Sequence, residues 1–131
     1  SDTITLGNGT ITKLRCQEIT ITALSDRRDK TDIEESSYGL DFIDKLKPVT
    51  FTWDRRDGYQ KNVKDIGFIA QDLQEVNDEY TRLVYDDNPD KLEATSGRLL
   101  PIMVKAIQDL AEENKKLKDR VTDLEIQLQT T

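Results

Sequence analysis

Ser25 and Lys30 are the side chains whose types and spacing best suit a chemical reaction in this sequence. The chain contains no histidine, which excludes Ser-His-Asp and Cys-His catalysis and the common zinc sites. A serine hydroxyl then needs another base, and a lysine amine can act as one when burial or nearby cations favour its uncharged form. Arg27 and Arg28 supply such cations.

The residues alone leave two interpretations of this stretch open. Serine and lysine at this spacing occur in many loops, so a solvated loop, or a turn capped by Ser25 or Asp26, is the simpler one. In the reactive interpretation, Ser25 attacks the carbonyl of Leu24 and converts the amide bond between them to an ester, which water then hydrolyses. Backbone N–H groups would stabilise the oxyanion. Such a reaction is a single cut rather than an enzyme cycle.

The composition excludes several classes of partner. The chain has 131 residues, enough for one small domain, and its net charge of −7 opposes binding to nucleic acid and to anionic membranes. It has no apolar run of about 18 residues and no signal-peptide pattern, so we expect a soluble protein without a membrane partner. The single Cys16 excludes an internal disulfide and a cysteine metal cluster. We expect neither a metal site nor a cofactor.

Residues 1–24 are predicted to be extended. The triplet Thr-Ile-Thr recurs three times, and threonine and isoleucine at period two suit a half-buried strand. The sequence Gly7-Asn8-Gly9 is a turn signal between strands. A few short strands bury little by themselves, so we expect the end of a β-rich fibre stem whose strands pair with other chains. An ordinary β-meander at a domain edge is the alternative.

Residues 25–98 are predicted to form a small mixed α/β globule. All eight aromatic residues lie between positions 38 and 85, so the densest core is expected there. The apolar spacing after Tyr38 predicts a short helix that ends before Pro48. Phe51 and Trp53 alternate with threonines as in a strand, and we expect both to be core residues.

Shorter signals follow in the same zone. They predict a turn at Asp57-Gly58, a helix from Asp72 and a strand at 83–85. The acidic loop 86–90 carries paired carboxylates, which we interpret as a solvated loop rather than a cation site.

Residues 99–131 are predicted to form one long helix with a coiled-coil seam. The seam residues alternate in steps of three and four over four heptads without a slip, which is a strong coiled-coil signal. Because the last turns extend past any core that this chain can build, we interpret the stripe as an oligomer interface rather than as packing on its own domain. The seam consists of Leu100, Met103, Ile107, Leu110, Asn114, Leu117, Val121, Leu124 and Leu128.

Two further features of this helix fit an oligomer. With Leu100 at heptad position a, Asn114 is a buried polar a residue that would fix register at some cost in stability. Opposite charges occupy the flanking g and e positions, in the pairs Glu113 with Lys118 and Arg120 with Glu125. The mixed apolar types in the seam do not select two strands over three.

Four blocks occur in series along the chain. The first is Ser25-Asp26-x-Arg28-x-Lys30 followed by Asp32-Ile33, and the others lie at 46–53, 67–72 and 99–110. Together they resemble the intramolecular chaperone family found at the C-termini of phage endosialidases, tail fibres and neck appendages, which includes the self-cleaving domain of the myelin regulatory factor. The family has Asn where this chain has Asp32. The resemblance covers residues 25 to about 128.

The resemblance implies a homotrimer that helps a fibre to assemble. In similar proteins the globule and coiled coil bring three chains together, the upstream β-fibre folds, and the chaperone is cut off at the serine. By resemblance, Ser25 and Lys30 form a Ser-Lys dyad that cuts between Leu24 and Ser25, with Asp26 and Arg28 supporting the loop. The implied partners are further copies of the chain and its own upstream fibre.

The sequence therefore predicts an α+β protein with an extended β segment, a mixed α/β globule and a long C-terminal helix in a homotrimeric coiled coil. The expected function is an intramolecular chaperone of a phage tail fibre or tailspike used in host attachment. It would act in the host cytoplasm during virion assembly and be released by single-turnover autoproteolysis, while the fibre stays in the virion tail. A permanent trimeric fibre-end module with an inactive cleavage site is the alternative. The acidic charge argues against a coiled-coil transcription factor.

Overall fold

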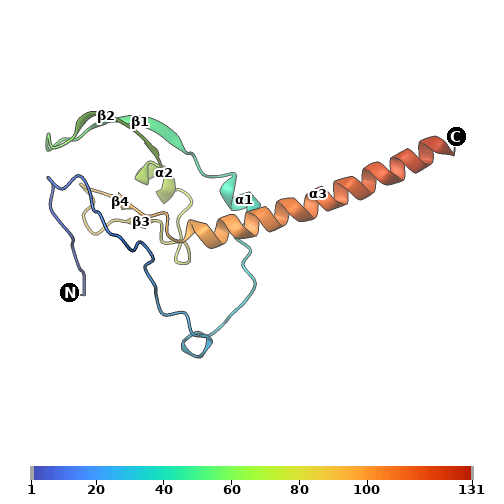
Figure 1. Cartoon of the computed structure of the whole chain (residues 1–131), viewed down its shortest axis with the longest axis horizontal. Helices are drawn as coiled ribbons and strands as arrows, with labels where there is room; N and C mark the ends of the chain where they lie inside the picture. Colours follow the sequence, from blue (N-terminus) through green and yellow to red (C-terminus); the bar gives the residue numbers. More distant parts are fainter. Residues whose placement is uncertain (1, 131) are drawn as a thin grey trace. The chain divides into compact units, whose positions relative to one another are not determined.

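The protein is mixed α/β with two small sheets and a long C-terminal helix (Figure 1). The structure, a computed structural model, describes residues 2–130. The elements in chain order are η1 (Arg27–Asp29), α1 (Leu40–Ile43), β1 (Val49–Asp54), β2 (Lys61–Gly67), α2 (Ala70–Gln74), β3 (Val84–Tyr85), β4 (Glu93–Ala94) and α3 (Leu99–Gln129). Here η1 is a 3-10 helix.

Packing divides the chain into two compact units. The first contains Ser1–Glu34 and Thr50–Asp65, and the second contains Glu35–Val49 and Ile66–Thr131. The division into zones 1–24, 25–98 and 99–131 stays a prediction.

The buried core belongs to the second unit. Phe42 of α1, Leu73 of α2 and Leu83 before β3 pack against Leu99 and Ile102 in the first turns of α3. Leu83 has no exposed surface. Burying these side chains is the main favourable term for such a small unit. Three of these five core residues lie in the predicted 38–85 region, and the first turns of α3 supply the other two.

A polar network closes the loop between α2 and β3. The Asn77 side-chain oxygen accepts hydrogen bonds from Leu83 N at 2.6 Å and from Thr81 Oγ1 at 3.1 Å. Asp78 accepts from Thr81 N at 2.9 Å and from the Tyr38 hydroxyl. The bond from Tyr38 lowers the pKa of Asp78 and raises the pKa of Tyr38 itself. The buried Thr81 thus has the partners that burial of a polar group requires.

Strands β1 and β2 form a two-stranded sheet that lies mostly in the first unit. The predicted turn at Gly58 is confirmed, with φ of 80°, a left-handed conformation that glycine adopts without strain. Phe51 and Trp53 pack ring edge to ring face, with 5.1 Å between the ring centroids. Trp53 Nε1 donates a hydrogen bond to the Asp65 carboxylate at 3.1 Å. Both rings are only half-buried. The prediction that they are core residues is wrong for the single chain, because no second layer covers this sheet within the first unit.

Residues 2–24 form no strand in the single chain. The predicted turn at Asn8 is present, since Ile11 N donates to Asn8 O at 3.3 Å and the Asn8 side chain accepts from Thr10 N at 2.9 Å. The apolar side chains of this segment are exposed, Ile21 to 96%. Strands in these residues stay a prediction for chains that have a neighbour to pair with.

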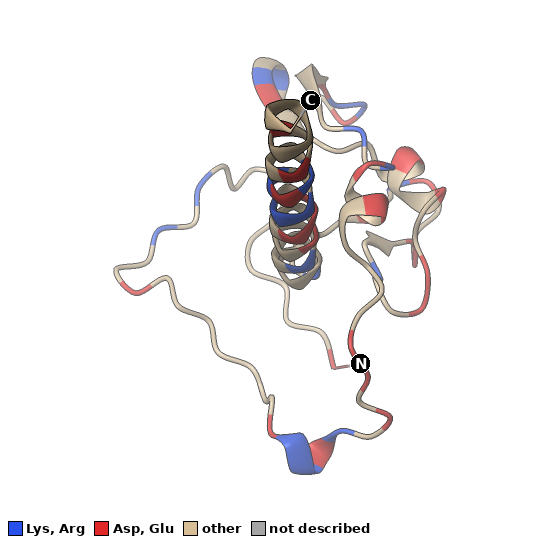
Figure 2. Cartoon of the chain, turned by 90° about the vertical axis from the view of Figure 1, so that its right-hand side faces the viewer, with Lys and Arg blue, Asp and Glu red and all other residues tan. Residues whose placement is uncertain are grey.

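Helix α3 confirms the long helix predicted from the heptad spacing. It runs for 31 residues, and from Leu110 onward every described residue is exposed. Basic and acidic residues alternate in bands along the ribbon of this helix (Figure 2). None of the helices within residues 2–130 combines the length and apolar character needed to cross a membrane.

Candidate functional site

The predicted reactive stretch folds as a single 3-10 turn. Asp26 precedes η1 and caps it, because its side chain accepts a hydrogen bond from Arg28 N at 2.8 Å. At the other end, Lys30 N donates to the Arg27 carbonyl at 3.2 Å. The turn brings the side chain of Lys30 back to Ser25, five residues earlier in the chain.

Asp26 also holds the side chain of Arg28. Its two carboxylate oxygens accept from Arg28 Nε at 3.0 Å and from Nη2 at 2.8 Å, which is a bidentate pair. The hydrogen bond from the Arg28 side chain lowers the pKa of Asp26, and the same bond raises the pKa of Arg28. Arg28 is exposed, so the pair adds little to stability. Its effect is to fix the shape of the turn and to hold the Asp26 carboxylate against the Arg28 guanidinium.

Lys30 Nζ lies 2.7 Å from Ser25 Oγ. This is hydrogen-bond reach for a proton transfer between the two groups. A lysine acts as a base only in its uncharged form, which burial favours. Ser25 and Lys30 are both exposed in the single chain. Any burial of this pair therefore has to come from a surface outside the single chain as described.

Asp32, just after the predicted reactive stretch, has an unusual backbone conformation. Asp32 has a φ of 52°, in the left-handed region that Asn and Asp tolerate better than other non-glycine residues. This left-handed residue lies two positions after Lys30 in the chain.

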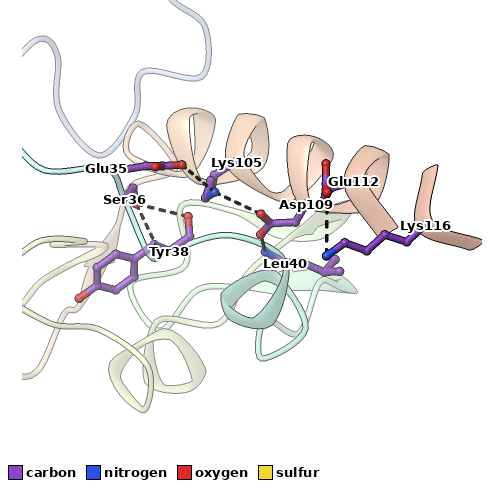
Figure 3. Close-up of polar contacts among 8 residues, drawn as sticks. All are labelled: Glu35, Ser36, Tyr38, Leu40, Lys105, Asp109, Glu112 and Lys116. Atoms are coloured by element: carbon purple, nitrogen blue, oxygen red, sulfur yellow. Dashed lines mark hydrogen bonds and ion pairs between the residues drawn. The ribbon is translucent and has the colours of Figure 1, made fainter. Parts of the chain in front are cut away.

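A charged clamp on α3 holds the segment before α1 (Figure 3). Lys105 Nζ contacts the carboxylates of Glu35 at 3.2 Å and of Asp109 at 3.3 Å. Asp109 in turn accepts a hydrogen bond from Leu40 N at 3.1 Å, at the start of α1. This bond from Leu40 is the main cause that lowers the pKa of Asp109, and Glu35 is the main cause that raises the pKa of Lys105. Gly39 lies so close that a methyl group there would overlap the Asp109 carboxylate.

The apolar seam of α3 is open to solvent. The globule packs on the side of the helix that carries Ile102 and Ala106, both buried, whereas Leu100 is 67% exposed and Leu117 is 63% exposed. Two shallow depressions on the helix surface meet at Asn114 and Leu117. The helix thus packs on its own chain with one side and presents the predicted seam on another.

Comparisons with known proteins place this arrangement in a family. The Peptidase S74 family model, described as "Chaperone of endosialidase", matches residues 25–84. Residues 25–84 thus match the chaperone-of-endosialidase family, which confirms the resemblance over this range. The match begins at Ser25, the residue whose hydroxyl contacts Lys30. The family's name is that of a peptidase.

Two curated relatives are named as phage long tail fibre proteins. They are the "Long tail fiber protein Gp37" of Enterobacteria phage M1 and of Enterobacteria phage Ox2, each 33% identical over 102 residues. These residues are 72% of this chain and 38% of each relative. This chain therefore spans well under half the length of either relative. No solved structure matches it.

The sequence prediction missed the clamp of Glu35, Lys105 and Asp109. Lys105 and Asp109 are four residues apart on one helix, which is a detectable pairing signal. Glu35 lies 70 residues before Lys105, and no local spacing relates the two. In residues 2–130, no cluster of three or more candidate ligands has the geometry for a metal ion.

Proposed function

We propose that this chain trimerises through α3, sets the register of a β-rich fibre upstream, and then releases itself by cutting between Leu24 and Ser25. The observation that carries the proposal is the 2.7 Å contact between Lys30 Nζ and Ser25 Oγ at the first residue of the family match. The open apolar seam of α3 supports the trimer.

The chemistry needs only groups of this chain and one water. Uncharged Lys30 takes the hydroxyl proton while Ser25 Oγ attacks the carbonyl carbon of Leu24. The bond from that carbon to the Ser25 nitrogen breaks, and the nitrogen takes the proton from the Lys30 ammonium. The product is an ester between Leu24 and Ser25 Oγ. Water hydrolyses it to a Leu24 carboxylate and a new chain that begins with Ser25.

The exposure of the dyad in the single chain suggests when the cut takes place. General-base action needs an amine that is free of its proton, and exclusion of water from a lysine side chain favours that form. Assembly of three chains, with folded strands beside the η1 turn, would bury the pair and exclude that water. The cut would then follow assembly, so that the chaperone is not lost before the fibre has formed.

The chaperone role follows from the kinetics of β-structure. Pairing of strands from different chains is slow and prone to errors of register. A parallel coiled coil in α3 holds the three N-terminal segments together and so raises their effective concentration. Removing the register-setting helices afterwards leaves the fibre kinetically trapped.

The names of the relatives support a phage tail fibre as the upstream partner. The partners of the chain are then two further copies of itself and the fibre to which each copy is joined. Assembly would take place in the host cytoplasm, with the fibre remaining in the virion tail and the chaperone released.

Mass spectrometry of the purified chain tests the cut. The expected fragment begins with Ser25, and it should disappear in Ser25→Ala and in Lys30→Ala. Ser37→Ala is the matched control, because this serine is exposed and lies outside the η1 turn. A fragment that persists in Ser25→Ala would contradict the mechanism.

A permanent trimeric module with an inactive cleavage site is the second candidate. The exposure of both Ser25 and Lys30 in the single chain favours it. This candidate predicts a trimer in sedimentation experiments together with a full-length chain after days of incubation. A trimer that cuts itself supports the first candidate instead.

A further inference from the structure

The first two heptads of α3 have different surroundings on their two flanks. Leu99 and Ala106 occupy position g and are 4% and 5% exposed, because the globule of the same chain covers them. Val104 occupies position e, on the other side of the seam, and is 48% exposed. Ala111, at the next e position, is also exposed. One flank is therefore packed within the chain, and the other is apolar and open.

The character of the e column changes further along the helix. The e positions after Ala111 are Lys118 and Glu125, as expected for a coiled coil whose flanks face solvent and pair by charge. Val104 and Ala111 break that pattern along, and just beyond, the part of α3 on which the globule packs. The apolar sector is thus widest beside the globule and narrows to the seam beyond it.

We propose that Val104 and Ala111 are covered by the globule of a neighbouring copy of this chain. This inference rests on the proposed trimer. In a parallel coiled coil, each e residue faces a g residue of the adjacent helix. Val104 would face Leu99 of the partner subunit, and Ala111 would face Ala106 of the partner subunit. In the partner subunit, Leu99 and Ala106 are covered by the partner's own globule. The exposed e residues of the first chain would therefore contact the edge of the partner's globule.

The arrangement has a consequence for assembly. Each globule would pack against the helix of its own chain and against the helix of the next chain. Three such contacts form a closed ring. The interface would then extend beyond the seam and include a part of the folded globule. Trimerisation and docking of the globule on α3 would stabilise each other, because each contact holds in place a surface that the other contact buries.

A lysine at position 104 separates this proposal from an ordinary coiled coil. Solvent-facing e positions accept lysine, as Lys118 illustrates, so Val104→Lys is harmless if the flank is open. If a globule covers it, an ammonium has to be buried without a partner. We then expect the trimer dissociation constant to rise by about tenfold or more. Gln108→Lys, one turn later on an exposed position, is the matched control and should leave the constant unchanged.

Sedimentation equilibrium gives two distinguishable failures. A wild-type chain that is monomeric overturns the proposed trimer and this inference with it. A wild-type trimer that tolerates Val104→Lys overturns this inference alone.

A photo-crosslinking amino acid at position 104 identifies what covers it. Crosslinks to residues 35–49 or 66–99 of a second copy, seen as a dimer band and mapped by mass spectrometry, support the proposal. Crosslinks confined to residues 1–34, or to the same copy, would show a different occupant and overturn it. Absence of any crosslink in the trimer also overturns it.

Discussion

Helix α3 and residues 2–24 both expose apolar side chains at regular spacing, and they differ in where their backbone hydrogen bonds are made. The helix satisfies its own N–H and C=O groups, so it is formed in the single chain. The extended segment has no strand to pair with in the single chain, and a strand cannot satisfy its backbone alone. If the proposed trimer forms, this difference predicts that the helices associate first and the strands pair afterwards.

The largest effect is expected from breaking the seam. Leu117→Asp puts a carboxylate in the middle of the apolar stripe, where burial of an unpaired charge is costly. The proposed trimer should dissociate to monomers at micromolar concentration in sedimentation experiments, and the N-terminal segment should stay unprotected in hydrogen exchange. Lys115→Asp, an exposed position off the seam, should remain trimeric. Protected amides in residues 2–24 of the monomeric variant would reverse the proposed order.

A smaller effect, on the stability of the single chain, is expected where Gly39 packs against α3. In Gly39→Ala the new methyl group would overlap the Asp109 carboxylate and lie 2.8 Å from Lys105 Cγ. Overpacking of this kind costs about 1–3 kcal/mol, measurable as a lower free energy of unfolding in urea. In Gly97→Ala the methyl group has only Thr95 Oγ1 nearby, at 3.5 Å, so this control should be close to neutral. Equal losses in both variants would mean that the close approach at Gly39 is relaxed in solution.

The pH dependence of the free energy of unfolding tests the same contact between α1 and α3. Because the hydrogen bond from Leu40 lowers the pKa of Asp109 in the folded chain, its stabilising contribution is present above the usual carboxyl pKa of about 4 and is lost as pH falls through the lowered value. Asp109→Asn should remove this part of the acid sensitivity. Lys105 has the opposite sign, and its contribution is lost at alkaline pH as its raised pKa is passed. Thermal unfolding of both proteins between pH 2 and 7 measures the difference, and parallel curves would contradict it.

The smallest effect is expected in the extended segment. Ile21→Lys changes a side chain that is almost fully exposed, so the trimer dissociation constant and the unfolding of the globule should not change. The same substitution should impair strand pairing once a fibre is attached, because one face of each strand must then be buried. A weaker trimer in the isolated Ile21→Lys chain would show that this segment takes part in the first association.

The regular elements were predictable where apolar spacing fixes them. The seam defines α3, and alternation defines β1. Strand β2 was missed because residues 61–65, most of its length, carry one apolar residue, and this strand is held by pairing with β1 rather than by burial. Strand β4 was missed because it has two residues, Glu93 and Ala94, which are defined only by their pairing with β3.

The sequence predicted the residues of the candidate site, but it did not predict the long-range contacts that hold the segment after it. Ser25 and Lys30 are close in the chain, so a single turn can bring them together. The contact of Glu35 with Lys105 spans 70 residues and depends on how α1 docks on α3. The wrong expectation for Phe51 and Trp53 has a related cause, because alternation predicts a strand with one face to cover and does not say that the same chain covers it.

Trp53 gives the chain an internal optical probe. It is the one tryptophan in the sequence, and its indole N–H is bonded to Asp65 within the β1–β2 sheet. Its emission therefore reports on that sheet, whereas the far-ultraviolet circular dichroism is dominated by the 31 residues of α3. The two signals, recorded on one unlabelled sample, reveal whether sheet and helix melt together or in sequence.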